Sequence, residues 1–202
     1  MAGKRAARTA QTRARIKAAL VELIGEKGFD ALTVSDVTRR AKINRGTFYL
    51  HFVDKYDMLD QLEDELIQGL EQTLLANAPA DATDACELFP YETLLAALNL
   101  VAGDFDFVRA IAGRGGDPDF SSKLKRVIEG LLEQGLARTG TTLRGDDELP
   151  LVYSRELAIS HVLSIIGLWL ERGGTETPEQ LARMIAAAKD VSPSSLLRPA
   201  VR

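Results

Sequence analysis

Residues 16–62 read IKAALVELIGEKGFDALTVSDVTRRAKINRGTFYLHFVDKYDMLDQL, and this stretch decides the fold. Its first part has apolar side chains at the i, i+4, i+7 and i+8 positions of a helix with one buried face: Ile16, Leu20, Leu23 and Ile24. Gly28 supplies the left-handed residue that commonly ends a helix, and Phe29 offers an apolar contact just beyond it. The pattern predicts an amphipathic helix that ends at Gly28.

Three further helix starts follow within the same stretch. Thr33 with Asp36 three residues later is a helix-start signal ahead of a short apolar segment. A second start lies near Asn44, and a third lies at Asp54, ahead of a longer periodic run. Two short helices joined by a tight turn, between two longer helices, are typical of a helix-turn-helix DNA-binding unit.

Helical periodicity continues through the rest of the chain, and β signals are scarce. Glycine-rich or polar breaks separate the further helices that we expect: one that ends at the Gly113–Pro118 break, and others at about 91–101, 119–138, 151–171 and 178–189. The sequence therefore predicts an all-α fold, in which a three-helix helix-turn-helix domain is joined by a long helix to a C-terminal helical bundle that dimerises. The predicted boundaries are 10–70 for the DNA-binding domain (helix-turn-helix about 33–52), 71–190 for the C-terminal domain, to which the resemblance described below adds effector sensing, and 1–9 and 191–202 for flexible tails.

Charge is unevenly distributed along the chain. The whole chain has a formal net charge of −4, but residues 1–55 hold twelve Lys and Arg against five Asp and Glu, a net charge of +7. Residues 56–202 hold 13 basic and 24 acidic residues, a net charge of −11. A basic first quarter on an acidic body is the pattern expected of a nucleic-acid-binding module carried by another domain.

The sequence gives little support for an enzyme or for a metal-binding, secreted or membrane protein. The chain has no glycine-rich phosphate loop and no Ser-His-Asp set, its two histidines lie far apart, and Cys86 is its only cysteine, so we predict no enzyme, no metal site and no cofactor. The basic N-terminus lacks the apolar core of a secretory signal. The longest apolar run, Leu157–Leu170, is shorter than the roughly 20 residues that a bilayer requires. We therefore expect a buried helix, no membrane association and a cytoplasmic location.

The spacing of several motifs is specific. They are Gly28-Phe29, Leu32-Thr33-Val34 and Thr47-Phe48-Tyr49-x-His51-Phe52-x-x-Lys55. In this spacing the stretch resembles the DNA-binding domain of the TetR family of transcriptional regulators. Ile165–Ile185 and the motif Gly116-Asp117-Pro118-x-Phe120 resemble the C-terminal region of one branch of that family. The resemblance implies a regulator, commonly a repressor, that a small-molecule effector releases from its operator.

The second helix of a helix-turn-helix enters the major groove, and here it is expected at about Arg45–His51. Arg45 can donate two hydrogen bonds to a guanine edge, with a phosphate contact as the alternative. The resemblance implies phosphate contacts for Tyr49 and Lys55, and either a backbone contact or a structural role for His51. The candidate residues for contact with double-stranded DNA are Thr33, Lys42, Arg45, Gly46, Thr47, Tyr49, His51 and Lys55.

Short recognition helices read few base pairs, so we expect a homodimer on a palindromic operator. The predicted helix at 151–171 is apolar on several faces, which favours burial by its own domain on one side and by a second copy on the other. The candidate interface residues are Ile159, Val162, Leu163, Ile166, Trp169 and Leu170. A central core helix of a monomer is the alternative.

An effector pocket rests on the resemblance alone, and the effector itself is unknown. The aromatic candidates for its lining have ordinary core packing as their alternative role: Phe89, Tyr91, Phe105, Phe107 and Phe120. The alternative function is a helix-turn-helix protein without a small-molecule ligand, controlled by protein partners or by redox chemistry at Cys86.

Overall fold

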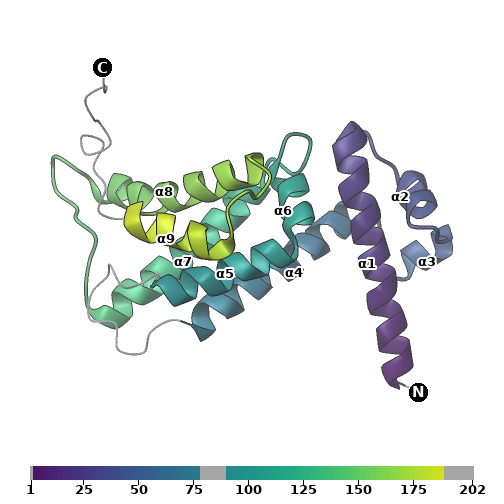
Figure 1. The fold of residues 1–202 in the computed structure, drawn as a ribbon, viewed down its shortest axis with the longest axis horizontal. Coiled ribbons are helices and arrows are strands. Elements are labelled where there is room, and N and C mark those ends of the chain that lie inside the picture. Colours follow the sequence, from purple (N-terminus) through teal and green to yellow (C-terminus); the bar gives the residue numbers. More distant parts are fainter. Residues whose placement is uncertain (1, 78–89, 189–202) are drawn as a thin grey trace. The chain divides into compact units, whose positions relative to one another are not determined.

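The computed structural model describes residues 2–77 and 90–188, and within these ranges every regular element is an α-helix (Figure 1). The helices are α1 (Ala2–Lys27), α2 (Val34–Arg40), α3 (Arg45–Tyr49), α4 (Lys55–Ala76), α5 (Tyr91–Gly103), α6 (Phe105–Ala112), α7 (Phe120–Thr139), α8 (Leu151–Glu171) and α9 (Pro178–Ala188). The prediction of an all-α fold is confirmed over these ranges. The chain divides into two compact units, which we call the first unit (Met1–Gly69 with Asp104–Leu124) and the second unit (Leu70–Gly103 with Lys125–Arg202).

α1 is the longest helix of the first unit, and its apolar stripe is buried: Ile16, Leu20, Leu23 and Ile24. It begins at Ala2, so residues 2–9, which the sequence predicts to be a flexible tail, form its first turns. Alanine and arginine are frequent there, and both have a high helix propensity. Gly28 ends the helix with a φ of +78°, as expected, and its N–H donates to the carbonyl oxygen of Ile24 at 2.9 Å.

Capping side chains set the starts of the two short helices. Thr33 caps α2, because its Oγ1 accepts from the N–H of Asp36 (3.2 Å) and the Asp36 carboxylate accepts from the N–H of Thr33 (2.9 Å). Asn44 caps α3, because its Oδ1 accepts from the N–H of Thr47 at 2.7 Å. Both helices therefore start where the sequence predicts a start.

The loop between α6 and α7 packs on the end of α1, within the first unit. The carbonyl oxygen of Gly115 accepts from the N–H of Phe29 at 2.7 Å. A Cβ on Gly115 (φ +84°) would lie 3.2 Å from the Cα of Gly28, so glycine permits this close approach of two backbones. A Cβ on Gly116 would lie 2.1 Å from the carbonyl oxygen of Ile111, a distance that no side chain tolerates. The predicted glycine-rich break is therefore a loop that packs against the end of α1.

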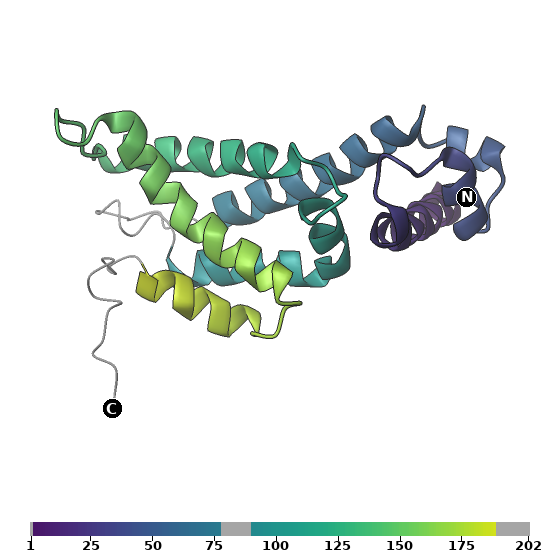
Figure 2. The ribbon, with the colours of Figure 1, turned by 90° about the horizontal axis from the view of Figure 1, so that it is seen from above.

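The second unit is built from the end of α4, α5, most of α7, α8 and α9. α9 lies against both α5 and α8 (Figure 2). Apolar side chains of these three helices form a core: Leu94, Leu98, Ile159, Trp169, Leu181 and Ile185. Trp169 lies in the last turn of α8. Its indole N–H donates to the carbonyl oxygen of Glu176, beyond the end of the helix, at 2.9 Å and so fixes the turn into α9.

Candidate nucleic-acid interface

α3 is fixed by two phenylalanines and presents its opposite face to solvent. Phe48 and Phe52 are buried, with their ring centroids 5.5 Å apart. Arg45, Gly46 and Tyr49 are exposed, and the Arg45 guanidinium donates to the hydroxyl of Tyr49 at 3.3 Å. This five-residue helix therefore carries a guanidinium and a phenol side by side on its outward face.

Thr47 and His51, which the sequence also predicts to contact DNA, have neighbours within the unit. Thr47 is half-buried, and its hydroxyl donates to Asn44 Oδ1 at 2.9 Å, so it reinforces the cap of α3. His51 is half-buried, and its ring centroid lies 6.1 Å from that of Phe52. Thr47 therefore contributes to holding α3.

Two arginines of α1 that the sequence reasoning missed hold the turn and the end of the motif. Lys42, in the turn, is exposed and has a φ of +52°, the left-handed conformation. The Arg15 guanidinium donates to the carbonyl oxygens of Ala41 and Lys42 and so anchors this turn. The guanidinium of Arg13 lies 4.6 Å from the ring centroid of Phe52. These contacts join residues far apart in the chain, so no local pattern could have revealed them.

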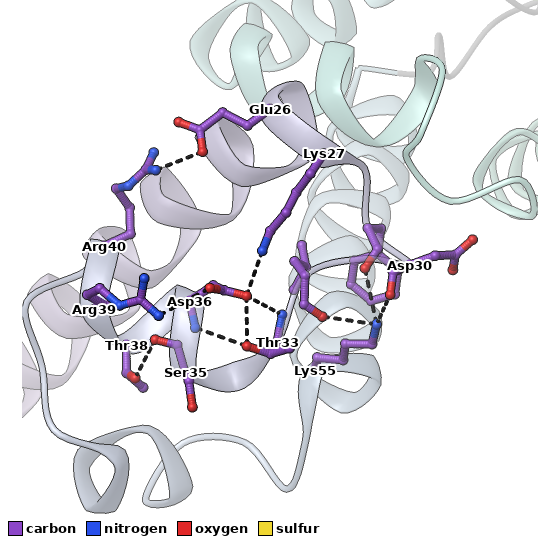
Figure 3. A network of polar contacts seen from close by, with 12 residues as sticks. Glu26, Lys27, Asp30, Thr33, Ser35, Asp36, Thr38, Arg39, Arg40 and Lys55 are labelled. Atoms are coloured by element: carbon purple, nitrogen blue, oxygen red, sulfur yellow. Dashed lines mark hydrogen bonds and ion pairs between the residues drawn. The ribbon is translucent and has the colours of Figure 1, made fainter.

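The start of α2 is the centre of a polar network (Figure 3). The Asp36 carboxylate accepts from the ammonium of Lys27 (2.7 Å) and from the hydroxyl of Thr33 (2.7 Å), and these bonds hold the pKa of Asp36 below its usual range. Arg40, at the other end of α2, pairs with Glu26 of α1 at 2.8 Å. Thr33 is exposed at the surface, but its hydroxyl and N–H both take part in the cap.

Lys55, the first residue of α4, is half-buried against the connection between α1 and α2. Its Nζ donates to three carbonyl oxygens there: Phe29 (3.1 Å), Asp30 (2.8 Å) and Leu32 (3.2 Å) (Figure 3). The Nζ also lies 5.0 Å from the ring centroids of Phe29 and Tyr56. All three N–H donors of the ammonium group thus have acceptors inside the unit.

Exposed apolar side chains lie around the end of α3: Tyr49, Leu50, Val53 and Tyr56. Leu50 is 83% exposed, the most of the four. The sequence reasoning passed over Leu50 and Val53 because apolar residues in a periodic stretch are normally assigned to the core. On a DNA-binding surface, apolar groups can contact thymine methyl groups. Leu50 and Val53 therefore join the candidate interface.

A second polar cluster lies between α4 and the start of α7. Fully buried Glu63 accepts from Lys123 Nζ at 2.6 Å, and the same ammonium lies 2.9 Å from Asp60 and 3.3 Å from Asp117. Burial, partly offset by Lys123, raises the pKa of Glu63 to about 7. The other carboxylate oxygen of Glu63, Oε1, has no hydrogen-bond partner among the described residues. No group of three or more His, Cys, Asp or Glu side chains in the described ranges is arranged to hold a metal ion.

The aromatic pocket candidates that the structure describes are divided between the two units: Phe105, Phe107 and Phe120 in the first, and Tyr91 in the second. Phe107 and Phe120 are buried, and Tyr91 is half-buried. Phe89 and Cys86 lie outside the described residues. The candidates therefore do not define one site within a unit.

Most of the predicted interface residues of α8 are core residues of the second unit. Ile159, Val162, Trp169 and Leu170 are buried within the unit, and Leu163 and Ile166 are half-buried. The exposed apolar side chains of α8 are different: Leu151, Val152, Tyr153, Leu157 and Leu168. Residue type alone could not separate the two sets, because the helix is apolar along nearly its whole length.

α8 is also the one helix in the described ranges that is long and apolar enough to cross a membrane, by length and composition alone. Two of its charged side chains pair with α7: Arg155 lies 3.2 Å from Glu133, and Glu156 accepts from Lys125. These ion pairs favour a helix packed in the bundle of the second unit.

A helix-turn-helix with an exposed recognition helix, in a chain whose first quarter is basic, defines a DNA-binding regulator. Comparison with protein families agrees: residues 16–62 match the model described as "Bacterial regulatory proteins, tetR family", and residues 90–188 match "Transcriptional regulator C-terminal region". The chain belongs to the TetR family of bacterial transcriptional regulators, and it binds DNA through its helix-turn-helix.

Individual relatives are distant in sequence. The uncharacterized HTH-type transcriptional regulator YxbF of Bacillus subtilis is 24% identical over 186 residues, which are 91% of this chain and 46% of that protein, so the chain spans about half the length of this curated relative. A putative TetR-family regulator from Syntrophomonas wolfei has a similar structure (TM-score 0.63, 20% identity, 88% of this chain and 92% of that chain). The regulator FadR from Bacillus subtilis, in complex with stearoyl-CoA, has a TM-score of 0.61 at 20% identity, over 87% of this chain and 96% of that chain. These structural similarities establish the shared fold.

Proposed function

We propose that the protein is a repressor that binds a palindromic operator as a homodimer and is released by a small-molecule effector. The outward face of α3 carries the DNA-binding part of this proposal, because Arg45 and Tyr49 lie opposite the buried Phe48 and Phe52. In this geometry the start of α3 enters the major groove. Arg45 then reads the O6/N7 edge of a guanine, and Tyr49 contacts a phosphate. Bacterial operators lie on cytoplasmic DNA, so the protein acts in the cytoplasm.

The dimer part of the proposal rests on the exposed face of α8. Tyr153, Leu157, Ser164 and Leu168 are exposed and recur at the spacing of one helix face. A two-fold axis brings the same stripe of two copies together, which removes its apolar side chains from water. The short α3 reads few base pairs, so two copies are needed to recognise an operator.

The effector part of the proposal is supported by a relative and by two buried polar atoms. The Bacillus subtilis regulator FadR, which shares the fold, is known in complex with stearoyl-CoA. In the second unit, Ser154 Oγ and His161 Nε2 are buried and have no hydrogen-bond partner among the described residues. They lie seven residues apart, on one face of α8, and this proposal assigns them the role of orienting a polar group of the ligand. Acyl-CoA thioesters are therefore the first probes to test.

The DNA-binding part is tested by selecting bound sequences from a random DNA pool with the full-length protein. We expect a palindrome, and we expect Arg45→Ala to lose discrimination at one base pair per half-site, worth about 1–3 kcal/mol. Tyr49→Ala should instead weaken binding to all sequences, because a phosphate contact carries no sequence information. The salt dependence should stay that of the wild type, because the phenol is uncharged and its loss changes no counterion release. If both variants bind the selected DNA like the wild type, α3 does not dock as proposed.

The effector part is tested by thermal melting and by operator release in the presence of stearoyl-CoA and shorter acyl-CoA thioesters. A ligand of the folded protein raises its melting temperature by mass action, and an effector also releases the operator. If the protein binds the operator and no compound in a broader screen releases it, control without a small-molecule ligand is favoured.

A further inference from the structure

We propose that Lys55 is a positioning residue for operator binding: its ammonium group holds the connection between α1 and α2 against the start of α4, and it does not contact a phosphate. Lys55 lies where the family motif implies a phosphate contact. The contacts of its side chain within the first unit are the observation that points to a different role.

The ammonium group of Lys55 is saturated by the protein. An ammonium group has three N–H donors, and here they meet three carbonyl oxygens at distances of 2.8 to 3.2 Å. Two aromatic rings, those of Phe29 and Tyr56, each place their centroid 5.0 Å from Nζ. A phosphate contact would require the side chain to leave several good interactions for a single exposed one.

The three carbonyl groups lie in the connection between two helices. They belong to Phe29, Asp30 and Leu32, which follow the left-handed stop at Gly28, so their chain has left α1 and has not yet entered α2. Near the C-terminal end of a helix, partial negative charge accumulates, and a cation there is stabilising. Lys55 thus places a cation from another helix in the connection that follows the end of α1.

The same bonds fix α2. Leu32, whose carbonyl Lys55 binds, immediately precedes Thr33, the cap of α2. α2 leads through the turn at Lys42 to α3, and the chain returns to Lys55 at the start of α4. Lys55 therefore closes a loop of chain that contains both helices of the helix-turn-helix. Without it, the start of α2 loses its attachment to α4, and α3 loses part of its orientation.

The test compares Lys55→Met and Lys55→Arg with the wild type on the operator selected above, over a series of salt concentrations. Met keeps the length without the charge, and Arg keeps a cation that binds phosphate well but cannot place one atom among three converging carbonyls. At a temperature where each protein is fully folded, we expect both variants to raise the Kd by about tenfold or more, the loss of one charge-assisted hydrogen bond. The slope of log K against log salt should stay that of the wild type. Lys42→Asn is the comparison for a lost phosphate contact: Lys42 is an exposed candidate contact, so its loss should lower the salt slope by about 1, and asparagine tolerates the positive φ of this position.

A phosphate contact predicts the opposite pattern. Lys55→Met would then lower the salt slope by about 1, and Lys55→Arg would bind like the wild type; this result would overturn the proposal. A purely structural role would lower the melting temperature and leave the Kd of the folded protein unchanged, which would also contradict it.

A measurement on the unmutated protein covers the case in which the variants do not fold. The NMR signal of the Lys55 ammonium, detected through its bonded protons, should report a hydrogen-bonded group in the free protein and should not shift when the selected operator is added. A large shift on DNA binding would exclude the proposed role. The proposal rests on the operator binding proposed above. If no operator is selected, that function fails, but the NMR signal of the free protein still shows whether the Lys55 ammonium is hydrogen-bonded within the protein.

Discussion

Among residues 2–77 and 90–188, Glu63 is the one carboxyl group whose burial raises its pKa to about 7. Its pKa of about 7 in the folded protein lies above the 4.5 of an ordinary glutamate. The folded protein therefore holds one more proton than the unfolded chain between these values, and the free energy of unfolding falls as the pH rises from about 4.5 to about 7. The hydrogen bonds to Asp117 outweigh its burial and keep its pKa low, while carboxylates around Lys123 keep the lysine pKa high, so both stay charged near neutral pH.

Glu63→Gln should remove this dependence on pH. The amide can accept from Lys123 and donate towards Asp117, and it carries no charge that burial could penalise. At pH 8 we expect the variant to be more stable than the wild type by roughly 3 kcal/mol, and at pH 5 the two should be nearly equal. Urea unfolding at pH 5, 6, 7 and 8 measures both. Asp60→Asn, on the exposed side of the cluster, is the control and should change little. A wild type whose stability rises from pH 5 to pH 8 would contradict this.

At the residue scale, the features that the sequence predicted are those that depend on neighbouring residues in the chain. The stop at Gly28 and the caps at Thr33 and Asn44 are local, because the bonded atoms lie within four residues of one another. The bonds of Lys55 and the burial of Glu63 depend on helices distant in the sequence, so no spacing rule could have found them. The family motif implies a phosphate contact for Lys55, but it does not reveal the three carbonyl oxygens that the residue binds within the first unit.

The α6–α7 loop has no room for an added side-chain atom at Gly116. In Gly116→Ala the new Cβ would lie 2.1 Å from the carbonyl oxygen of Ile111, so the loop must move. We expect the substitution to destabilise the protein by about 2 kcal/mol or more, measured by urea unfolding. Gly25→Ala is a matched control in α1, where a Cβ meets nothing within 4 Å and should stabilise the helix by about 0.5–1 kcal/mol. Equal effects of the two substitutions would show that the loop adapts.

The helices themselves were largely predictable, because periodicity and caps act along the chain. The predicted helix at 151–171 has the same bounds as α8, and the predicted helix at 178–189 begins at the same residue as α9. The outward face of α8 was not predictable. Leu157 and Leu168 are exposed while Ile159 and Trp169 are buried, and only the packing of α5 and α9 distinguishes them.

At the scale of the whole molecule, the exposed stripe of α8 should determine the oligomeric state. Leu157 and Leu168 are 62% and 57% exposed in the single chain. In the double variant Leu157→Lys with Leu168→Lys, like charges would face each other across the two-fold axis, so we expect a folded monomer with weakened operator binding. Size-exclusion chromatography with light scattering measures the mass, and circular dichroism checks the helix content. Leu50→Lys, also exposed but in the first unit, should remain dimeric. A double variant that stays dimeric would place the interface elsewhere.

The attachment of the α6–α7 loop to α1 determines where this protein can be cut and joined to part of another regulator. Phe29 finds the acceptor for its N–H at Gly115, and Lys17 of α1 binds Asp104 at the start of α6, so Asp104–Leu124 folds with the helix-turn-helix. A chimera cut at the end of α4 would separate these partners and leave a backbone donor without its acceptor. Exchange of C-terminal domains between regulators of this kind therefore calls for a discontinuous graft that retains Asp104–Leu124 with the helix-turn-helix.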